Sequence, residues 1–543
     1  MDDNTRWYEE AVFYEMYLRA YQDSDGDGHG DLRGAIERLD HVQSLGVDCI
    51  WIMPMYPSPL KDDGYDVADY YNIHSDYGTL EDFQAFLDAA HERGLKVVTD
   101  LVMNHTSDQH HWFQEGRRDP DSAYHDYYVW SETGEEYSDA RIIFLDYEDS
   151  NWTYDEVAGK YFWHRFYSSQ PDLNYDNPAV HEEMFNIIRF WLDMGVDGFR
   201  ADAVPYLYER EGTNCENLPE THAFLQKLRA MMDEEYPGRV LIAEANQWPE
   251  DVMPYFGAGN EFHMCFHFPI MPRLYMALRQ HDKTPIVSIL NRTPEPPDPG
   301  AWLTFLRNHD ELTLEMVTPE ERQWMWEQYA PDPRMRLNLG IRRRLAPLLD
   351  NDRQKWLLLH ALLLSLPGTP IVYYGDEIGM GDNIWLPDRH GVRTPMQWDD
   401  SPNAGFSDAE ETYLPVIDDG EYGFQKVNVA AQEDDPNSYL AATRFLLQAR
   451  KATAELRYGE MAWYPTESAS VLAYWRVLGE QRTLCLFNLD SQPHSLSLDL
   501  RDYQGRRLVD LLAEDEGREI DRWPVVLNLR PYAAHWLRLG GGQ

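Results

Sequence analysis

Short runs of branched and aromatic residues alternate with amphipathic helical patterns along most of the chain. Eight of these runs predict β-strands, because such residues bounded by turn residues favour strands. The stretches between them, such as LEDFQAFLDAAHERG and VHEEMFNIIRFWLDMG, place apolar residues at helical spacing and end at glycine, as helices do. The predicted strands are Val12 to Tyr17, Cys49 to Ile52, Lys96 to Leu101, Gly198 to Asp202, Val240 to Glu244, Met264 to Phe268, Trp302 to Leu306 and Pro370 to Tyr374.

A regular strand–helix repeat belongs to the α/β class, and eight units of it close into a (β/α)8 TIM barrel. The active site of such a barrel lies at the carboxyl ends of its strands. The chain has 543 residues, which is too long for one ordinary compact core. We therefore expect a large barrel domain with insertions and a smaller second domain.

The interval between the third and fourth predicted strands is too long for one connection. Residues 105–177, which are dense in Tyr, Trp, Asp and Ser, therefore predict an inserted lid lobe over the barrel mouth. The lobe divides the barrel into a first part, 1–104, and a second part, 178–456. The second part carries two further predicted insertions, a helical one at about 312–360 and a loop rich in Gly, Pro and Asp at about 381–430.

The tail of the chain, residues 457–543, has a different pattern. Apolar and polar residues alternate with a period of two in VLAYWRVL, RTLCLFNL and HSLSLDL. Strict alternation is typical of antiparallel strands with one buried face. We expect a C-terminal antiparallel β-sandwich domain.

Charge and cysteine content exclude several classes of partner. A formal net charge of −47 disfavours nucleic acid and anionic membranes, which would both be repelled, but not a small neutral substrate. The four cysteines are scattered without a C-x-x-C pair, as expected of free thiols in a reducing cytoplasm. The N-terminus lacks the pattern of a signal peptide, and prolines interrupt the longest apolar run, so no membrane span is expected. The sequence leaves a homo-oligomer open.

Charged side chains cluster where the predicted strands end. One acidic residue at a strand end is commonly structural, but four strands that deliver carboxylate or imidazole to one rim are costly in stability, and such clusters usually belong to functional sites. The residues concerned are Asp100, Asn104 and His105 after the third strand, Arg200 and Asp202 at the fourth, Glu244 at the fifth, and His309 and Asp310 after the seventh.

The four motifs DLVMNH, DGFRADAV, AEAN and FLRNHD, in this order, closely resemble those of the α-amylase family of retaining glycoside hydrolases, and the resemblance covers essentially the whole chain. It implies that Asp202 is the nucleophile, Glu244 the general acid and base, and Asp310 the third carboxylate that grips sugar hydroxyls. His105 and His309 would hydrogen-bond the same glucose.

Cleavage of a glycosidic bond requires side chains of these types. One carboxyl must be protonated and the other ionised, roughly 5 Å apart when configuration is retained. Arg200 lies two residues before Asp202 in one strand, so it points to the same face and is expected to lower the pKa of that aspartate. Glu244 has no such neighbour in sequence and is expected to stay protonated near neutral pH.

The stretch DSDGDGHGDL, residues 23–32, has the alternating aspartates of a calcium loop. An EF-hand is not expected, because the twelfth position of the loop, where an EF-hand needs a bidentate glutamate, is Gly34. In addition, a predicted strand and not a helix precedes the loop. Some α-glucosidase-like members of the family carry calcium in the loop after strand one, and the ligands implied here are Asp23, Asp25, Asp27, the carbonyl of His29 and Asp31. An acidic turn without metal is the alternative.

The resemblance implies a second structural calcium ion and no organic cofactor. This second ion would tie the lobe to the barrel through side chains and two backbone carbonyls, the latter leaving no trace in the sequence. Its implied ligands are Asn104, Asp172, Glu209 and the carbonyls of Tyr206 and Leu207.

Two stretches concern the substrate. In KDDGYDVADY, Asp62 and Tyr65 match exo-acting members of the family, in which they bind the terminal glucose and block long chains. HGVRTPMQWD, with Arg389 and Arg393, resembles the loop that closes over the acceptor in the α-glucosidase and glucosyl-isomerase branch. The alternative is that this arginine pair forms salt bridges on an acidic surface.

Three further stretches, FWHRFYSSQPDLNYDNP, PYLYEREGTNCENLPETH and NHDELTLEMV, resemble family members that isomerise maltose to trehalose. They imply a double displacement in a closed pocket, with minor hydrolysis to glucose. Candidates for the lid are aromatic residues of the lobe, Arg141, Asn246, Glu311 and the loop from Arg389 to Arg393.

Two other readings remain. An exo-acting α-glucosidase that hydrolyses small α-glucosides would share every catalytic residue. A non-catalytic relative, such as the amylase-like ectodomains of transporter heavy chains, would have lost the three carboxylates and would carry a membrane helix.

Overall fold

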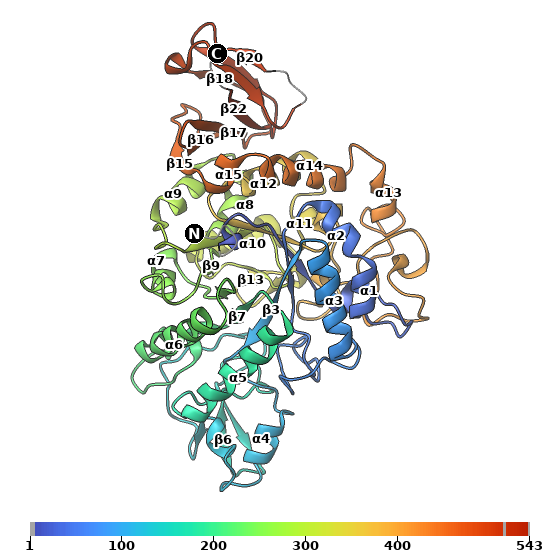
Figure 1. The fold of residues 1–543 in the computed structure, drawn as a ribbon, viewed down its shortest axis with the longest axis vertical. Coiled ribbons are helices and arrows are strands. Elements are labelled where there is room, and N and C mark those ends of the chain that lie inside the picture. Colours follow the sequence, from blue (N-terminus) through green and yellow to red (C-terminus); the bar gives the residue numbers. More distant parts are fainter. Residues whose placement is uncertain (1–5, 514–516, 541–543) are drawn as a thin grey trace.

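The computed structural model describes residues 6–513 and 517–540. The outer ends of the predicted first barrel part and tail, 1–5 and 541–543, lie outside the described residues, as do 514–516 in the tail. Three parts follow one another along the long axis in Figure 1: the lobe with β6 at the bottom, the barrel in the middle and the C-terminal domain at the top.

Eight parallel strands form the closed barrel, in the order β1-β14-β10-β9-β8-β7-β3-β2. The predicted barrel is confirmed, and each strand lies within two residues of its expected bounds. The strands are β1 (Phe13–Met16), β2 (Cys49–Ile52), β3 (Lys96–Val102), β7 (Gly198–Asp202), β8 (Val240–Ala243), β9 (Met264–Phe266), β10 (Ala301–Phe305) and β14 (Thr369–Tyr373).

Helices surround the barrel and begin and end at the residues that favour helix termini. In α3, the side chain of Thr79 accepts a hydrogen bond from the backbone N–H of Asp82 in a capping box. The long helix α5 follows the cap Asn177 and ends at Gly195, whose φ of 111° suits glycine. The helices up to the excursion after β10 are α1 (Leu32–Glu37), α2 (Leu39–Leu45), α3 (Leu80–Glu92), α5 (Pro178–Met194), α6 (Pro219–Glu235), α7 (Pro249–Val252), α8 (Ile270–Gln280) and α9 (Thr284–Arg292).

The lobe between β3 and α5 has little regular structure. It contains α4 (His111–Gly116) and a three-stranded antiparallel sheet of β4 (Trp130–Ser131), β6 (Lys160–Trp163) and β5 (Trp152–Asp155). A small apolar cluster of Ala140, Trp152 and Trp163 includes Cys215 from the loop after β7. This cluster anchors the lobe beside the barrel mouth.

The excursion after β10 is mixed rather than helical alone. It holds α10 (Pro319–Tyr329) and α11 (Leu345–Leu348), but also a small antiparallel sheet of β11 (Leu312–Thr313), β12 (Arg336–Leu337) and β13 (Gly340–Ile341). The barrel helix α12 (Arg353–Leu363) follows. Residues 381–428 form turns without an α-helix or strand, and α13 (Val429–Glu433), α14 (Tyr439–Lys451) and α15 (Ala454–Tyr458) lead to the tail.

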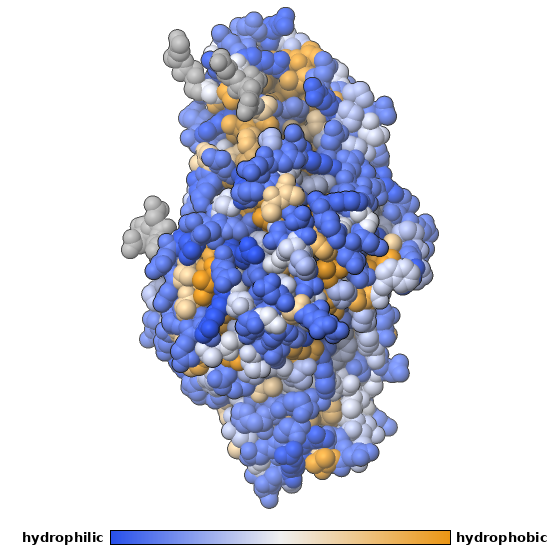
Figure 2. Space-filling view, turned by 90° about the vertical axis from the view of Figure 1, so that its right-hand side faces the viewer, coloured by the Kyte–Doolittle hydropathy of each residue, from blue (hydrophilic) through white to orange (hydrophobic). Residues whose placement is uncertain are grey.

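The tail forms two antiparallel sheets, one of six strands and one of two, with an apolar cluster of its own. Figure 2 shows hydrophilic residues over most of one face of the molecule and hydrophobic patches on the upper part, over this domain. Among the helices of the described residues, none has the length and apolar character that crossing a membrane requires. The strands are β15 (Glu460–Trp463), β16 (Val471–Leu478), β17 (Gln481–Asn488), β18 (His494–Leu498), β19 (Arg507–Asp510), β20 (Arg518–Glu519), β21 (Val525–Leu529) and β22 (Ala534–Leu539).

Candidate active site

A cavity of about 130 Å³ lies at the carboxyl ends of the barrel strands. Asp202 ends β7, while Glu244 and Asp310 follow β8 and β10. The cavity thus brings together all three candidate carboxylates and four of the predicted sugar-binding residues. Its lining includes Asp62, Tyr65, His105, Asp202, Glu244, Asp310, Arg389, Phe144, Phe166, Tyr206 and Phe268.

The guanidinium of Arg200 joins the first two carboxylates. It lies 2.6 Å from Asp202 Oδ1 and 2.6 Å from Glu244 Oε1, and a third contact of 2.5 Å reaches Asp100 below the cavity. The Asp202 and Glu244 carboxyls also lie close enough for each to influence the pKa of the other. Arg200 therefore forms ion pairs with both carboxylates, whereas its position in the sequence predicted a contact with Asp202 alone.

Burial dominates the protonation of both carboxyls. Burial, with help from Asp202 and Asp310, raises the pKa of Glu244 to about 8 against the opposing charge of Arg200, so Glu244 carries a proton at neutral pH as expected. Burial raises the pKa of Asp202 and outweighs Arg200, which lowers that pKa as expected. Sequence spacing identified the cation but not the cost of removing the aspartate from water.

His309 and Asp310 form one unit. His309 Nε2 lies 3.1 Å from Asp310 Oδ2 and 2.9 Å from the Tyr65 hydroxyl, while its Nδ1 bonds Glu15 of β1. Burial disfavours the charged imidazole, but Asp310 and Glu15 outweigh it and raise the pKa of His309 to about 9. His105 behaves in the opposite way, because burial lowers its pKa to about 3 and its Nε2 bonds only the backbone carbonyl of Tyr65.

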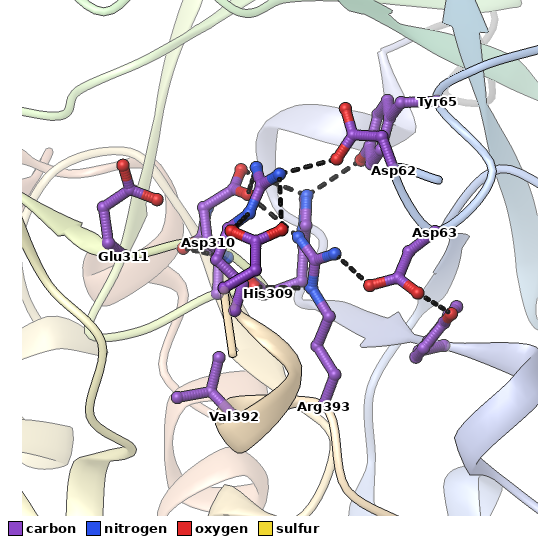
Figure 3. A network of polar contacts seen from close by, with 12 residues as sticks. Asp62, Asp63, Tyr65, His309, Asp310, Glu311, Val392 and Arg393 are labelled. Atoms are coloured by element: carbon purple, nitrogen blue, oxygen red, sulfur yellow. Dashed lines mark hydrogen bonds and ion pairs between the residues drawn. The ribbon is translucent and has the colours of Figure 1, made fainter. Parts of the chain in front are cut away.

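Both arginines of the pair are buried, and Arg389 lines the cavity. Arg389 lies 2.6 Å from Asp62 Oδ1 and 2.9 Å from Asp310 Oδ1, and Arg393 lies 3.1 Å from the same Asp310 oxygen. Figure 3 shows Arg393 between Asp310 and Asp63, which it contacts at 2.5 Å. Because both arginines are buried, the surface salt-bridge alternative is excluded.

Arg141 of the lobe crosses the cavity rim to the barrel. It lies 2.8 Å from Glu216 in the loop after β7 and 2.7 Å from Glu315 beyond β11. Asn246 also donates to Glu315, at 3.3 Å. The sequence indicated Arg141 and Asn246 but not their two glutamate partners, since acidic residues in loops of so acidic a chain carry no distinguishing signal. Glu311 lines the cavity and accepts a hydrogen bond from Asn338.

The first predicted metal loop brings three of its carboxylates together. Ligand oxygens of Asp23, Asp25 and Asp27 lie within 4.8 Å of one another, which fits a hard cation. Asp31 is engaged elsewhere: its oxygens accept from Ser24 and, as the cap of α1, from the Gly34 N–H. The ring Nδ1 of His29 accepts a hydrogen bond from Arg19 Nε at 3.2 Å.

The second predicted metal site contains buried oxygen atoms without hydrogen-bond donors among the described residues. These three oxygens are Asn104 Oδ1, Asp172 Oδ2 and Glu209 Oε1. Burial raises the pKa of Asp172 to about 8, and burial together with the Asp172 charge raises that of Glu209 well above its ordinary value. Buried oxygens without donors suit a calcium ion, so the donor set fits. Tyr206 and Leu207 lie in the adjoining turn after β7.

Two family models match the chain. The model described as "Alpha amylase, catalytic domain" matches residues 15–331 and 342–459, and that described as "Maltogenic Amylase, C-terminal domain" matches residues 462–536. The chain belongs to the α-amylase family. Among its relatives in the α-amylase family, "Trehalose synthase/amylase TreS" of Mycobacterium tuberculosis is 56% identical over 98% of this chain and 90% of the relative.

"Trehalose synthase" of Pimelobacter sp. is 53% identical over 99% of this chain and 97% of the relative. An "Oligo-1,6-glucosidase" of Parageobacillus thermoglucosidasius is 31% identical over 97% and 98%, respectively. The solved structure of trehalulose synthase MutB from Pseudomonas mesoacidophila has a TM-score of 0.79 and 28% identity, covering 98% of this chain and 99% of that one. Identity within the α-amylase family is thus higher to the two trehalose synthases than to this glucosidase.

Proposed function

We propose that the chain interconverts maltose and trehalose by intramolecular transfer of a glucosyl group, with minor hydrolysis to glucose. The observation that carries the proposal is the single guanidinium of Arg200, which contacts both Asp202 and Glu244 at one cavity. Two relatives that are more than half identical to this chain are named trehalose synthases, which supports the choice of reaction.

The first step breaks the glycosidic bond of maltose. Asp202 attacks the anomeric carbon of the non-reducing glucose, and Glu244, protonated below about pH 8, gives its proton to the departing O4. The products are a β-glucosyl ester on Asp202 and a free glucose. Asp310 and His309 bind hydroxyls of the donor ring, and Asp62 with Arg389 closes the end of the cavity against longer chains.

The second step forms trehalose. The released glucose turns within the cavity and presents its anomeric hydroxyl to Glu244, now the base, while the hydroxyl oxygen attacks the ester carbon and frees Asp202. Two inversions preserve the α configuration of the donor. Water at roughly 55 M competes, so the acceptor wins only when enclosure gives it a larger effective molarity. The contacts of Arg141 with Glu216 and Glu315 supply that enclosure.

Two calcium ions complete the proposal as structural elements. One would be held by Asp23, Asp25 and Asp27, and the other by Asn104, Asp172 and Glu209 with the Tyr206 and Leu207 carbonyls. A bound cation supplies charge to buried oxygens and takes no part in the sugar chemistry. We place the protein in the cytoplasm, because its four cysteines are buried free thiols.

Product analysis tests the reaction. Purified protein is incubated with maltose alone, and the sugars are separated by anion-exchange chromatography, with Asp202→Asn as the inactive control. We expect trehalose to exceed glucose until equilibrium is reached, and incubation with trehalose to yield maltose. Glucose without trehalose would instead identify an exo-acting α-glucosidase.

A further inference from the structure

A glutamate of the first barrel strand lies directly behind His309. Glu15 is fully buried, and its Oε1 accepts hydrogen bonds from His309 Nδ1 and, at 3.3 Å, from the His309 backbone N–H. Its Oε2 has no hydrogen-bond partner in the part of the chain that the structure describes. A carboxylate is costly to bury, so a charge at this place needs a compensating cation. The only group that bonds it within the described residues is His309.

The opposite edge of the imidazole faces acceptors as well. His309 Nε2 lies 3.1 Å from Asp310 Oδ2 and 2.9 Å from the hydroxyl of Tyr65. That hydroxyl also receives a long hydrogen bond, 3.4 Å, from Arg200 Nη1. A neutral imidazole has one N–H and would direct a lone pair at a carboxylate on one side or the other.

We propose that Glu15 is a positioning residue that holds His309 as an imidazolium, so that Nε2 donates to Asp310 and fixes that carboxylate toward the donor sugar. Because a protonated Nε2 cannot accept from Tyr65, and Arg200 donates to the Tyr65 oxygen, the Tyr65 proton is free to reach a sugar hydroxyl. The proposal deepens the transfer reaction above and rests on it for the identity of the sugar. The charge state of His309 is testable without any substrate.

Charged and titratable groups on several neighbouring elements influence whether His309 is protonated. Burial opposes the imidazolium, while Asp310 and Glu15 favour it strongly enough to raise the pKa of His309 to about 9. Two further cations are near: the guanidinium of Arg200 of β7 lies over the Tyr65 ring, and Arg393 Nε donates to the His309 carbonyl. Asp100 of β3 interacts electrostatically with the imidazole, and the Trp51 ring of β2 packs edge-on against it. Behind Glu15 lie Tyr373 and Asp376.

The substitution Glu15→Gln separates charge from orientation. Its amide oxygen can still accept from Nδ1, so the ring keeps its place, but one of the two carboxylates that favour the imidazolium is gone. Burial and the cations Arg200 and Arg393 then act against Asp310 alone. We expect the pKa of His309 to fall in this variant, so that the ring loses its second proton at a lower pH than in the parent.

Titration of His309 by NMR tests the proposal. Histidine is labelled at its Cε1 carbon, and among the 19 histidines the His309 signal is assigned by its loss in His309→Gln. We expect the parent signal to titrate near pH 9 and that of Glu15→Gln at least one pH unit lower. Glu15→Asp, which restores the charge, should recover part of this shift.

The matched control is Glu377→Gln, which neutralises another fully buried glutamate that bonds Tyr14 and His41 instead of the active site. It should leave the His309 titration unchanged. A parent His309 that titrates below pH 7, or an unchanged titration in Glu15→Gln, would overturn the proposal. Either result is independent of whether maltose yields trehalose.

Discussion

The second metal site makes a prediction about stability whose sign depends on pH. Asp172 is 1% exposed, and burial raises its pKa from 3.8 to about 8 when no cation is bound. For an acid whose pKa is raised by folding, stability is present below the unfolded pKa and is lost as pH rises toward the folded pKa. The metal-free protein should therefore become less stable between pH 4 and pH 8.

The magnitude follows from the size of that shift. At pH 7 the unfolded carboxyl is ionised while the folded one is protonated, and about three pH units at 1.36 kcal/mol each correspond to about 4 kcal/mol of lost stability. Calcium, which binds the ionised form, should offset this loss. Its effect must be larger at pH 8 than at pH 5.5, where the site still carries a proton.

The assay is thermal unfolding at pH 5.5 and pH 8, in excess calcium or in EGTA. We expect calcium to raise the Tm by several degrees more at pH 8, and Asp172→Asn to abolish this difference while being no less stable than the calcium-free parent at pH 8. Asp25→Asn, in the other loop, is the matched control and should keep the pH-dependent response. Equal calcium effects at both pH values, or a normal response from Asp172→Asn, would refute the reasoning.

Three further predictions concern the active site. Glu244→Gln should lower kcat by 10²-fold or more, since the general acid is removed, as single-turnover kinetics with maltose can measure. The alkaline limb of kcat/KM in the parent should lie near pH 8, where Glu244 loses its proton, and a limb below pH 6 would contradict that assignment. Arg141→Met should raise the ratio of glucose to trehalose about fivefold, because losing a partly exposed ion pair costs about 1 kcal/mol, which corresponds to that factor. Arg501→Met, which removes a remote ion pair, should leave the ratio unchanged.

The barrel was predictable because its signals are local. Branched runs, helical spacing and terminal glycines depend on neighbours in sequence, and all eight strands followed from them. Asp202, Glu244 and Asp310 were identifiable because each lies at or just beyond the end of a strand, and strand ends meet at one rim. The tail sheets followed from alternation with a period of two.

Contacts between distant segments were not predictable in this way. Glu15 lies 294 residues before His309, and only its position as a charge inside an apolar strand hinted at a role. The effect of Arg200 on Glu244 depends on the closeness of β7 and β8, and the raised pKa of Asp202 depends on burial, which spacing does not reveal. The sheet β11-β13-β12 was missed because each strand has only two residues.

The central claim is that one glucosyl group passes from Asp202 to a glucose that never leaves the cavity. Incubation with maltose and isotopically labelled free glucose measures this directly, since label enters trehalose only through an acceptor from solution. We predict that newly formed trehalose carries little label during the first turnovers. Trehalose labelled in proportion to the free glucose would contradict the claim and show that the acceptor exchanges with solvent.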